Sequence, residues 1–430
     1  GLVDGKNRPN VGYAELNAAW PVYLAANTVD VRNMKGTNPD LPGIKESTGR
    51  ELEWNPVPAA VNPYYAAYQL RNEDHRQRFI GRTSIQMNLL PSLFIKGTVA
   101  TDLMTYRDFN YVPKTNAFTP LGYYNSSQEL TDKNNLQLIA NYRDKFFADA
   151  IGLNLMVGAN RERDLGRSST ANGSEWVIPD FYSLTNLKNR DLVNASEIST
   201  GTNSVFGEAN LDWKSIAYLT VTGRQDWFSV LNPGYNAIFY PSVGGSLILS
   251  EIVELPEIFN FAKIRASWAQ VGSATVSAGS INQTYTISTV NAYGLPTLSN
   301  PNTLLNPNIR PITATTTEGG FQVQLFDNRI GLDVNYYSKK TENDILFPPI
   351  SQATGYSAGP RNLGLITNKG WEISLTGTPV SNNDFSWDVA FNFGYNKNKI
   401  VELAEGIDVL TLGSAIGGPT IINAVGLPYS

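Results

Sequence analysis

The stretch from Phe385 to Tyr395 is the most restrictive feature of the sequence. Large apolar side chains alternate there with small or polar ones, and the large set is Phe385, Trp387, Val389, Phe391, Phe393 and Tyr395. Successive side chains of a β-strand point to opposite faces, so the pattern predicts a strand with one bulky apolar face. About ten tilted residues of this kind span a bilayer, but a half-buried strand of a soluble sandwich has the same period. This stretch alone leaves a membrane barrel and a soluble sandwich open.

Neighbouring segments favour the barrel. Residues 371–376 alternate in the same way, and the short polar segment 379–384 would join them to the strand at 385–395 as a hairpin. Residues 321–325 and 330–337 predict a second hairpin, with its turn at Asp327–Asn328. Between the two hairpins lies the polar stretch Ser338–Thr367, far longer than the usual connection of about 4 to 6 residues. Short turns that alternate with long loops are typical of outer-membrane barrels.

The same alternation continues upstream. It predicts strands at residues 79–89, 93–101, 136–142, 153–159, 205–213, 218–226, 240–250 and 263–272. A tight turn is expected at Lys214–Ser215, between the strands at 205–213 and 218–226. Polar segments between these strands predict long loops at Tyr106–Asn135, at Arg161 to about Thr202 and at Ser273–Pro311. The series predicts an all-β fold, an antiparallel transmembrane β-barrel, of which this chain forms a part.

The first 75 residues differ from the rest because they are rich in proline and polar residues. One helical patch is expected at Ala14–Ala26, where Pro21 interrupts it. We expect residues 1–75 to be an extracellular loop region that enters a strand near Arg76. Residues 76–430 would then hold the strands and loops of the single barrel domain.

Composition agrees with a barrel. Of 430 residues, 17% are charged, whereas a soluble protein usually has about 25%. A barrel explains the low charge, since its outward band must be apolar and its inward face is polar but often uncharged. The lack of cysteine suits an oxidising compartment. A net charge of -5 with interspersed signs argues against a nucleic-acid partner.

The sequence offers little for catalysis or metal binding. One histidine, His75, and no cysteine leave almost no material for a metal site or for a Cys–His or Ser–His constellation. We therefore predict no enzymatic activity, no metal and no cofactor. Glu318 and Glu372 fall on the expected inward faces of nearby strands, and we interpret them as charged lining beside Arg and Lys partners.

The two ends of the sequence predict a larger protein. No run approaches 18 apolar residues, which excludes a helical membrane span, and the first residues do not form a signal peptide. The final residues, Gly426–Ser430, are typical of a turn and not of a closing strand. An open sheet edge in lipid would leave unpaired backbone groups, each costing several kcal/mol. We expect the chain to be an internal part of a longer barrel protein.

Aromatic residues in the expected loops are the candidates for ligand contact. They are Tyr123, Tyr124, Trp176, Tyr182, Tyr285 and Tyr293. An aromatic face can stack on a sugar ring, but such residues also pack loops or form the interfacial girdle of a barrel. Both interpretations remain open at this point.

Two adjacent motifs carry a family resemblance. Residues 206–213 (FGEANLDW) and 218–226 (YLTVTGRQD) resemble the SusC/RagA family of TonB-dependent outer-membrane transporters of Bacteroidetes. Further similar stretches follow in the family's order, at residues 239–244, 264–272, 328–337 and 368–372. The resemblance implies a plugged barrel of about 22 strands. It also implies a SusD-like surface lipoprotein over the extracellular loops and energy supplied through the TonB complex. The TonB box and plug have no counterpart here, so their residues cannot be carried over.

The resemblance implies TonB-dependent import of oligosaccharides or oligopeptides across the bacterial outer membrane. A surface-binding or adhesive barrel without transport is the first alternative, and a soluble all-β carbohydrate-binding protein is the second. The expected loops at Tyr106–Asn135 and Ser273–Pro311 contain many Tyr, Asn, Ser and Thr but few cationic residues. This composition favours a polar oligomer over a metal chelate and suits neutral sugars and peptide backbone alike. Since the family imports both and nothing in the sequence decides between them, a glycan is preferred only narrowly.

Overall fold

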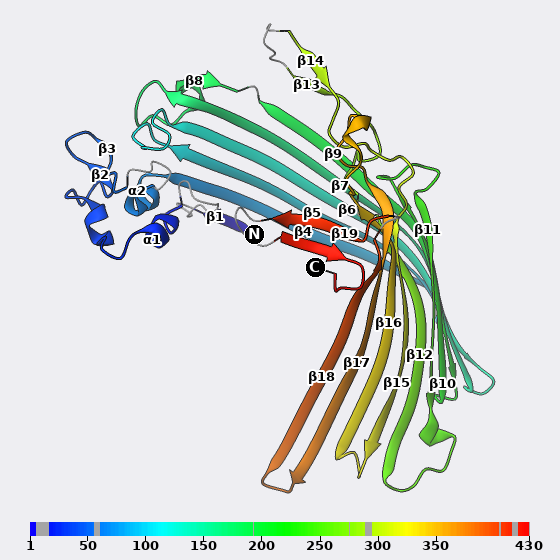
Figure 1. Cartoon of the computed structure of the whole chain (residues 1–430). Helices are drawn as coiled ribbons and strands as arrows, with labels where there is room; N and C mark the ends of the chain where they lie inside the picture. Colours follow the sequence, from blue (N-terminus) through cyan, green and yellow to red (C-terminus); the bar gives the residue numbers. More distant parts are fainter. Residues whose placement is uncertain are drawn as a thin grey trace. The chain divides into compact units, whose positions relative to one another are not determined.

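Long antiparallel strands dominate the structure, a computed structural model (Figure 1). It describes residues 1–5, 17–55, 61–191, 193–274, 276–288, 295–403, 406–414 and 420–429. A 14-stranded sheet follows the order β1-β4-β5-β6-β7-β9-β10-β11-β12-β15-β16-β17-β18, with β8 paired to β7. The predicted all-β, antiparallel class is therefore confirmed. The strands of this sheet are β1 (Leu2–Gly5), β4 (Arg71–Leu90), β5 (Leu93–Val112), β6 (Tyr123–Phe146), β7 (Ile151–Trp176), β8 (Leu187–Arg190), β9 (Asn194–Trp213), β10 (Ala217–Phe228), β11 (Ala237–Ile248), β12 (Phe259–Ser273), β15 (Ile312–Leu325), β16 (Ile330–Leu346), β17 (Arg361–Ser381) and β18 (Ser386–Glu402).

Shorter elements occupy the connections. Three hairpins are formed by β2 (Ile44–Lys45) with β3 (Arg50–Glu51), β13 (Thr286–Ser288) with β14 (Thr297–Ser299), and β19 (Val409–Ser414) with β20 (Thr420–Ala424). The helices are α1 (Trp20–Leu24), α2 (Pro63–Tyr68) and the 3-10 turns η1 (Val31–Lys35), η2 (Leu184–Asn186), η3 (Leu249–Glu251) and η4 (Gln352–Thr354). Among the residues that the structure describes, no helix has the length and apolar character needed to cross a membrane.

The chain divides into two compact units. Unit 1 comprises Gly1–Arg82, Ala100–Asn134 and Arg163–Ser199, and unit 2 comprises Thr83–Val99, Asn135–Glu162 and Thr200–Ser430.

A buried carboxylate organises the short elements of unit 1. Glu51 is 4% exposed, and its Oε2 accepts hydrogen bonds from Asn116 Nδ2 (3.0 Å) and the Ala117 amide (2.9 Å). Its other oxygen accepts a bond from the Asn62 amide. Burial raises the pKa of Glu51, and the backbone bonds offset part of that rise. Asn62 also caps α2, since its side chain accepts bonds from the amides of Tyr64 and Tyr65. One carboxylate thus ties the N-terminal segment to the connection between β5 and β6.

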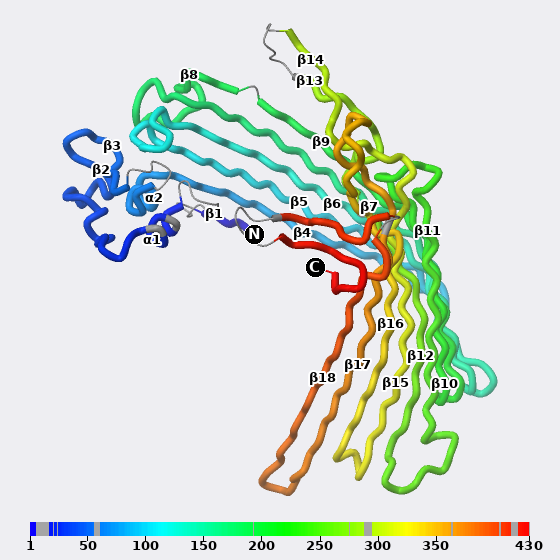
Figure 2. The backbone as a smooth tube through the Cα atoms, viewed as in Figure 1, coloured from blue at the N-terminus to red at the C-terminus, as the bar shows by residue number. Residues whose placement is uncertain are grey.

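Unit 2 contains tight hairpins at the predicted positions. Lys214 and Ser215 have φ of 51° and 59°, and Asp327 and Asn328 have φ of 54° and 64°. Short hairpin turns need positive φ because only then does the turn match the twist of its strands. The turns predicted at these two sites are confirmed, and Figure 2 shows β15 to β18 running side by side.

The sheet of unit 2 has an apolar face and a polar face. Paired residues of neighbouring strands share a face, and one such row reads Leu247, Ile264, Phe321, Val334, Ile373 and Phe393. On β18 the apolar side chains lie in the open, with Phe391 57% and Phe393 47% exposed. The single apolar face predicted for Phe385–Tyr395 is confirmed.

Several predicted loops are in fact strand. Within Tyr106–Asn135 only residues 113–122 connect β5 and β6. In the expected loop at Arg161–Thr202, β7 continues to Trp176 and β9 begins at Asn194. Within Ser338–Thr367, β16 continues to Leu346 and β17 begins at Arg361. These ends mix polar and apolar residues without a regular period, so they lack the alternation that identifies a half-buried strand. The loop predicted at Ser273–Pro311 is confirmed, because β12 ends at Ser273 and β15 begins at Ile312.

The N-terminal predictions need smaller corrections. β4 begins at Arg71 and not near Arg76, because it pairs with β1 over Asp74–Gln77. In residues 17–26, the described part of the helical patch expected at Ala14–Ala26, only the five residues of α1 are helical, with Pro21 in the first turn where its missing N–H costs nothing. Residues 14–16 of that patch lie outside the described residues.

Candidate functional site

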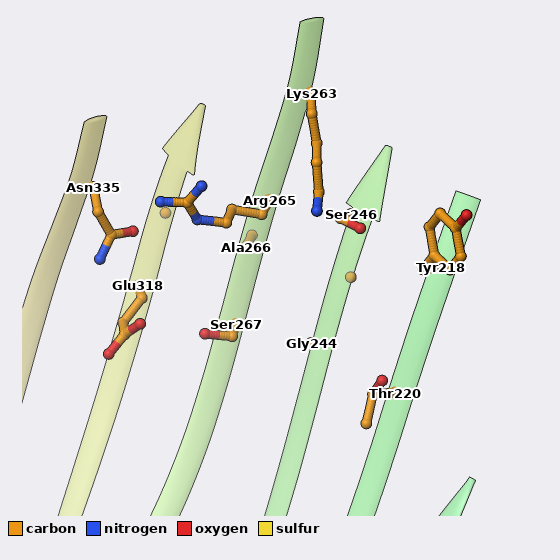
Figure 3. Close-up of a pocket in the computed structure, with 12 residues that line it drawn as sticks. Tyr218, Thr220, Gly244, Ser246, Lys263, Arg265, Ala266, Ser267, Glu318 and Asn335 are labelled. Carbon is orange, nitrogen blue, oxygen red and sulfur yellow. The ribbon is translucent and has the colours of Figure 1, made fainter. Parts of the chain in front are cut away.

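A hollow on the polar face of unit 2 is the candidate site, and its lining residues are here named the polar-face patch. The hollow has a volume of about 270 Å³ and receives side chains from five consecutive strands, β10, β11, β12, β15 and β16 (Figure 3). The side chains that line it are Tyr218, Thr220, Ser246, Lys263, Arg265, Ser267, Glu318 and Asn335. They offer hydroxyl, amide, ammonium, guanidinium and carboxylate groups within one concave surface.

Arg265 is the most firmly held group of the patch. Its Nη1 and Nη2 donate to the two carboxylate oxygens of Asp333 at 2.9 Å and 2.6 Å. Such a two-pronged bond fixes the plane of the guanidinium. Figure 3 shows the Arg265 side chain reaching across β15 toward Asn335 on β16. The pair therefore links β12 to β16 and holds a positive charge in a fixed position beside the hollow.

Gly320 allows Arg265 to cross the intervening strand. It lies opposite both Arg265 and Asn335 in the sheet register. A Cβ at Gly320 would come within 3.2 Å of Arg265 Nη2 and 2.8 Å of Asn335 Oδ1. Because Gly320 has no side chain, the guanidinium of Arg265 can cross β15 and reach Asp333.

Two further charges of the patch are not engaged in ion pairs. In the part of the chain that the structure describes, neither Lys263 nor Glu318 has an oppositely charged side-chain atom within 4.0 Å. Lys263 lies beside Ser246, whereas Glu318 lies opposite Ser267 (Figure 3). The patch therefore presents one cation and one anion that can each take a ligand group of opposite charge.

Glu318 and Glu372 share the polar face, as expected. Glu372 lies opposite Asn335 and Glu318 lies opposite Ser267, so both flank the strand region that Arg265 spans. Neither glutamate takes the bidentate bond of Arg265, which goes to Asp333. The charged lining predicted for this face is present. Its cation, Arg265, pairs with Asp333, a carboxylate that the sequence did not single out.

Three predicted site residues meet in unit 1, in an aromatic cluster formed by Tyr111, Tyr124, Trp176 and Tyr182. Ring centroids are 5.3 Å apart for Tyr111 and Tyr124, and 5.4 Å apart for Trp176 and Tyr182. Trp176 is 1% exposed, and its Nε1 donates to the Val112 carbonyl at 2.8 Å. It anchors the cluster from inside and offers no face to a ligand.

Tyr182 connects the aromatic cluster to two charged residues. The Arg71 guanidinium lies over its ring at 5.4 Å from the centroid. Its hydroxyl donates to Asp180 at 3.2 Å. Burial, reinforced by the charge of Asp180, raises the pKa of Tyr182 to about 12. The hydroxyl is therefore neutral across the physiological range.

The remaining predicted residues lie apart from the cluster. Tyr123 opens β6 and packs against a buried core that contains Ile44, Val61 and Tyr65. Tyr285 is 67% exposed in the connection before β13. Tyr293 lies outside the described residues. Tyr124 and Trp176 belong to strands β6 and β7, not to the loops in which the sequence placed them.

Sequence reasoning missed most of the polar-face patch. Its members lie far apart in the chain, and Arg265 is 68 residues from Asp333. The alternation of each strand predicted their common face, but only the register brings them into one row. In the described ranges, no group of three or more His, Cys, Asp or Glu residues could hold a metal ion.

Comparison with known proteins gives the same fold. The family model described as "TonB dependent receptor-like, beta-barrel" matches residues 15–422. The TonB-dependent receptor P26 of Formosa agariphila is 30% identical over 247 residues, which are 55% of this chain and 24% of that receptor. The TonB-dependent receptor SusC of Bacteroides thetaiotaomicron is 30% identical over 104 residues, 24% of this chain and 10% of SusC.

A solved structure agrees over most of the chain. The RagAB peptide importer in its closed-closed state matches 86% of this chain and 40% of the solved chain, with a TM-score of 0.75 and 20% identity. The chain spans about a quarter of the length of receptor P26. These matches confirm the predicted resemblance to SusC and RagA and the predicted location. The chain therefore belongs to the TonB-dependent receptor-like β-barrel family, a family of outer-membrane receptors and transporters, and crosses the outer membrane with its strands.

Proposed function

We propose that the protein imports a short polar oligomer across the outer membrane in a TonB-dependent manner, together with a SusD-like surface lipoprotein. The observation that carries this proposal is the polar-face patch, which faces the barrel lumen because the opposite face is apolar. Its hydroxyl and amide groups suit repeated polar units. Its unpaired charges, Lys263 and Glu318, suit a ligand that bears both signs.

The charges of the patch favour an oligopeptide, and an oligosaccharide is the second candidate. A peptide has backbone amides for Ser246, Ser267 and Asn335, and its termini or side chains can pair with Lys263 and Glu318. The RagAB complex, whose fold is similar, is described as a peptide importer. The aromatic residues that favoured a glycan pack largely against one another in the aromatic cluster, while Tyr218 and the exposed Tyr285 keep faces for a sugar.

The proposal is tested by uptake in a deletion strain, with and without the full-length protein restored to it. We expect the strain without the protein to lose growth on peptides as carbon source, and wild-type protein to restore it only when TonB is functional. Lys263→Gln and Glu318→Gln should each lower uptake several-fold, because each removes one charged partner of the ligand. Lys214→Gln makes the same charge change as Lys263→Gln in the tight turn between β9 and β10 and should not affect uptake.

Other outcomes select between the alternatives. Growth loss on glycans alone would replace the peptide with an oligosaccharide. Growth loss confined to iron-limited medium would exclude a polar oligomer. Binding of the ligand without TonB-dependent uptake would identify an adhesive or surface-binding barrel.

A further inference from the structure

Four lysines gather on the apolar face of β16, β17 and β18, and they are here named the outer-wall lysine cluster: Lys340, Lys369, Lys397 and Lys399. Lys369 lies directly opposite Lys397, and Thr367 lies opposite both Lys340 and Lys399. All four side chains are exposed. The cluster belongs to unit 2 alone.

The strand period places these lysines on the lipid-facing side. Lys369 is two residues from Trp371, and Lys397 is two residues from Tyr395, so each shares a face with that aromatic residue. The row Tyr336, Trp371 and Tyr395 lies between the lysines and the apolar band, and the rings of Tyr336 and Trp371 are 4.8 Å apart. Aromatic girdles mark the bilayer interface in outer-membrane barrels. The lysines therefore lie at headgroup level.

The lysines lie on the extracellular side of this aromatic row. β17 and β18 are joined by the short turn at residues 382–385, and short turns of such barrels face the periplasm. Lys369 and Lys397 lie farther from that turn than Trp371 and Tyr395 do. The cluster thus meets the headgroups of the extracellular leaflet.

The cluster has an excess of positive charge. Lys340 pairs with Glu342 at 2.7 Å, but in the described part of the chain Lys369, Lys397 and Lys399 have no acidic side-chain atom within 4.0 Å. Like charges directly opposite each other destabilise a sheet, and Lys369 faces Lys397 in this way. An anion between the two ammonium groups would remove that repulsion.

We propose that the outer-wall lysine cluster binds the phosphate groups of a phosphorylated lipid in the extracellular leaflet. The apolar band and aromatic row below the lysines contact the lipid's acyl chains and interface, while the flexible lysine stems lift the ammonium groups to the phosphates. A soluble anion would use only the charges. The combination of apolar wall, aromatic row and unpaired lysines identifies a lipid.

Lipid binding by the purified full-length protein tests this proposal, with lipid A and enzymatically dephosphorylated lipid A as probes. We expect Lys369→Gln to weaken lipid A binding, and the double variant K369Q/K397Q to weaken it at least about tenfold. Lys339→Gln is the matched control, since Lys339 is exposed one residue away on the lumen face. It should bind lipid A as the wild type does.

The phosphate dependence decides the outcome. Dephosphorylated lipid A should bind the wild type about as weakly as lipid A binds the double variant. If the double variant does not assemble, K369R/K397R should assemble and retain lipid A binding, because it keeps both charges. The proposal would be overturned if wild type and K369Q/K397Q bound lipid A equally well. It would also be overturned if K369Q/K397Q lost binding of dephosphorylated lipid A to the same extent as binding of lipid A. If K369Q/K397Q lost binding of an acidic protein partner but bound lipid A as the wild type does, the proposal would be overturned as well.

Discussion

At the scale of single residues, a glycine makes the lumen site possible. The bond between Arg265 and Asp333 crosses β15 at Gly320, where any side chain would meet Arg265 Nη2, Asn335 Oδ1 and the Val334 carbonyl. The sequence contained all these residues in recognisable strands. It could not predict the bond, because a strand's alternation says which face a residue occupies and not which residue on another strand it meets.

Gly320→Ala should therefore separate Arg265 from Asp333. We expect the free energy of unfolding to fall by about 1 to 2 kcal/mol, since the new methyl group displaces a charged pair and crowds the backbone of β16. Urea unfolding of the full-length protein in lipid vesicles measures this change. Gly319→Ala is the control, because its Cβ would meet only the Arg265 carbonyl, at 4.0 Å. Equal destabilisation by the two variants would contradict the role given to Gly320.

At the scale of the strand, β18 divides its contacts between two environments. Phe391 lies opposite Leu375 on the apolar face, whereas Asn392 lies opposite Ser374 on the lumen face. We expect Phe391→Arg to impair membrane assembly by about 2 to 4 kcal/mol, because a guanidinium near the bilayer midplane loses its hydration. Asn392→Arg should be tolerated. Heat-modifiability of the full-length protein compares the two, and similar behaviour would show that the faces are assigned wrongly.

The sequence predicted the strands where lipid contacts them, but not their extensions outside the bilayer. Inside the bilayer one face must be apolar, so alternation identified strands such as residues 330–337 and 385–395. Beyond the bilayer both faces of a long strand meet water or other loops. The start of β6 at Tyr123 and the end of β7 at Trp176 therefore have mixed composition, and their sequence is typical of a loop. Neither boundary follows from hydrophobic period alone.

At the scale of the whole molecule, the wall and the long connections have separable roles. The connection between β12 and β15 carries the β13–β14 hairpin, which pairs only with itself in the described residues. Hydrogen bonds outside the hairpin hold the base of this connection. Gln283 Oε1 accepts a bond from the Leu305 amide at 2.8 Å, and the Leu304 amide donates to Ala358 at 2.9 Å. A hairpin on a fixed base can change without disturbing the barrel.

Replacing residues 284–300 of the full-length protein by a short Gly-Ser linker should therefore leave the barrel folded. The deletion keeps Gln283 and the contacts of Leu304 and Leu305, so we expect unchanged heat-modifiability and normal insertion in the outer membrane. Capture of the proposed surface lipoprotein, or uptake of the ligand, should fall several-fold, because the deletion removes an exposed extracellular surface that includes Tyr285. Tyr285→Ala separates the two effects: it should lower ligand uptake if the ring contacts the ligand and leave lipoprotein capture unchanged. A deletion variant that captures its partner and takes up ligand at wild-type levels would assign both contacts to other loops.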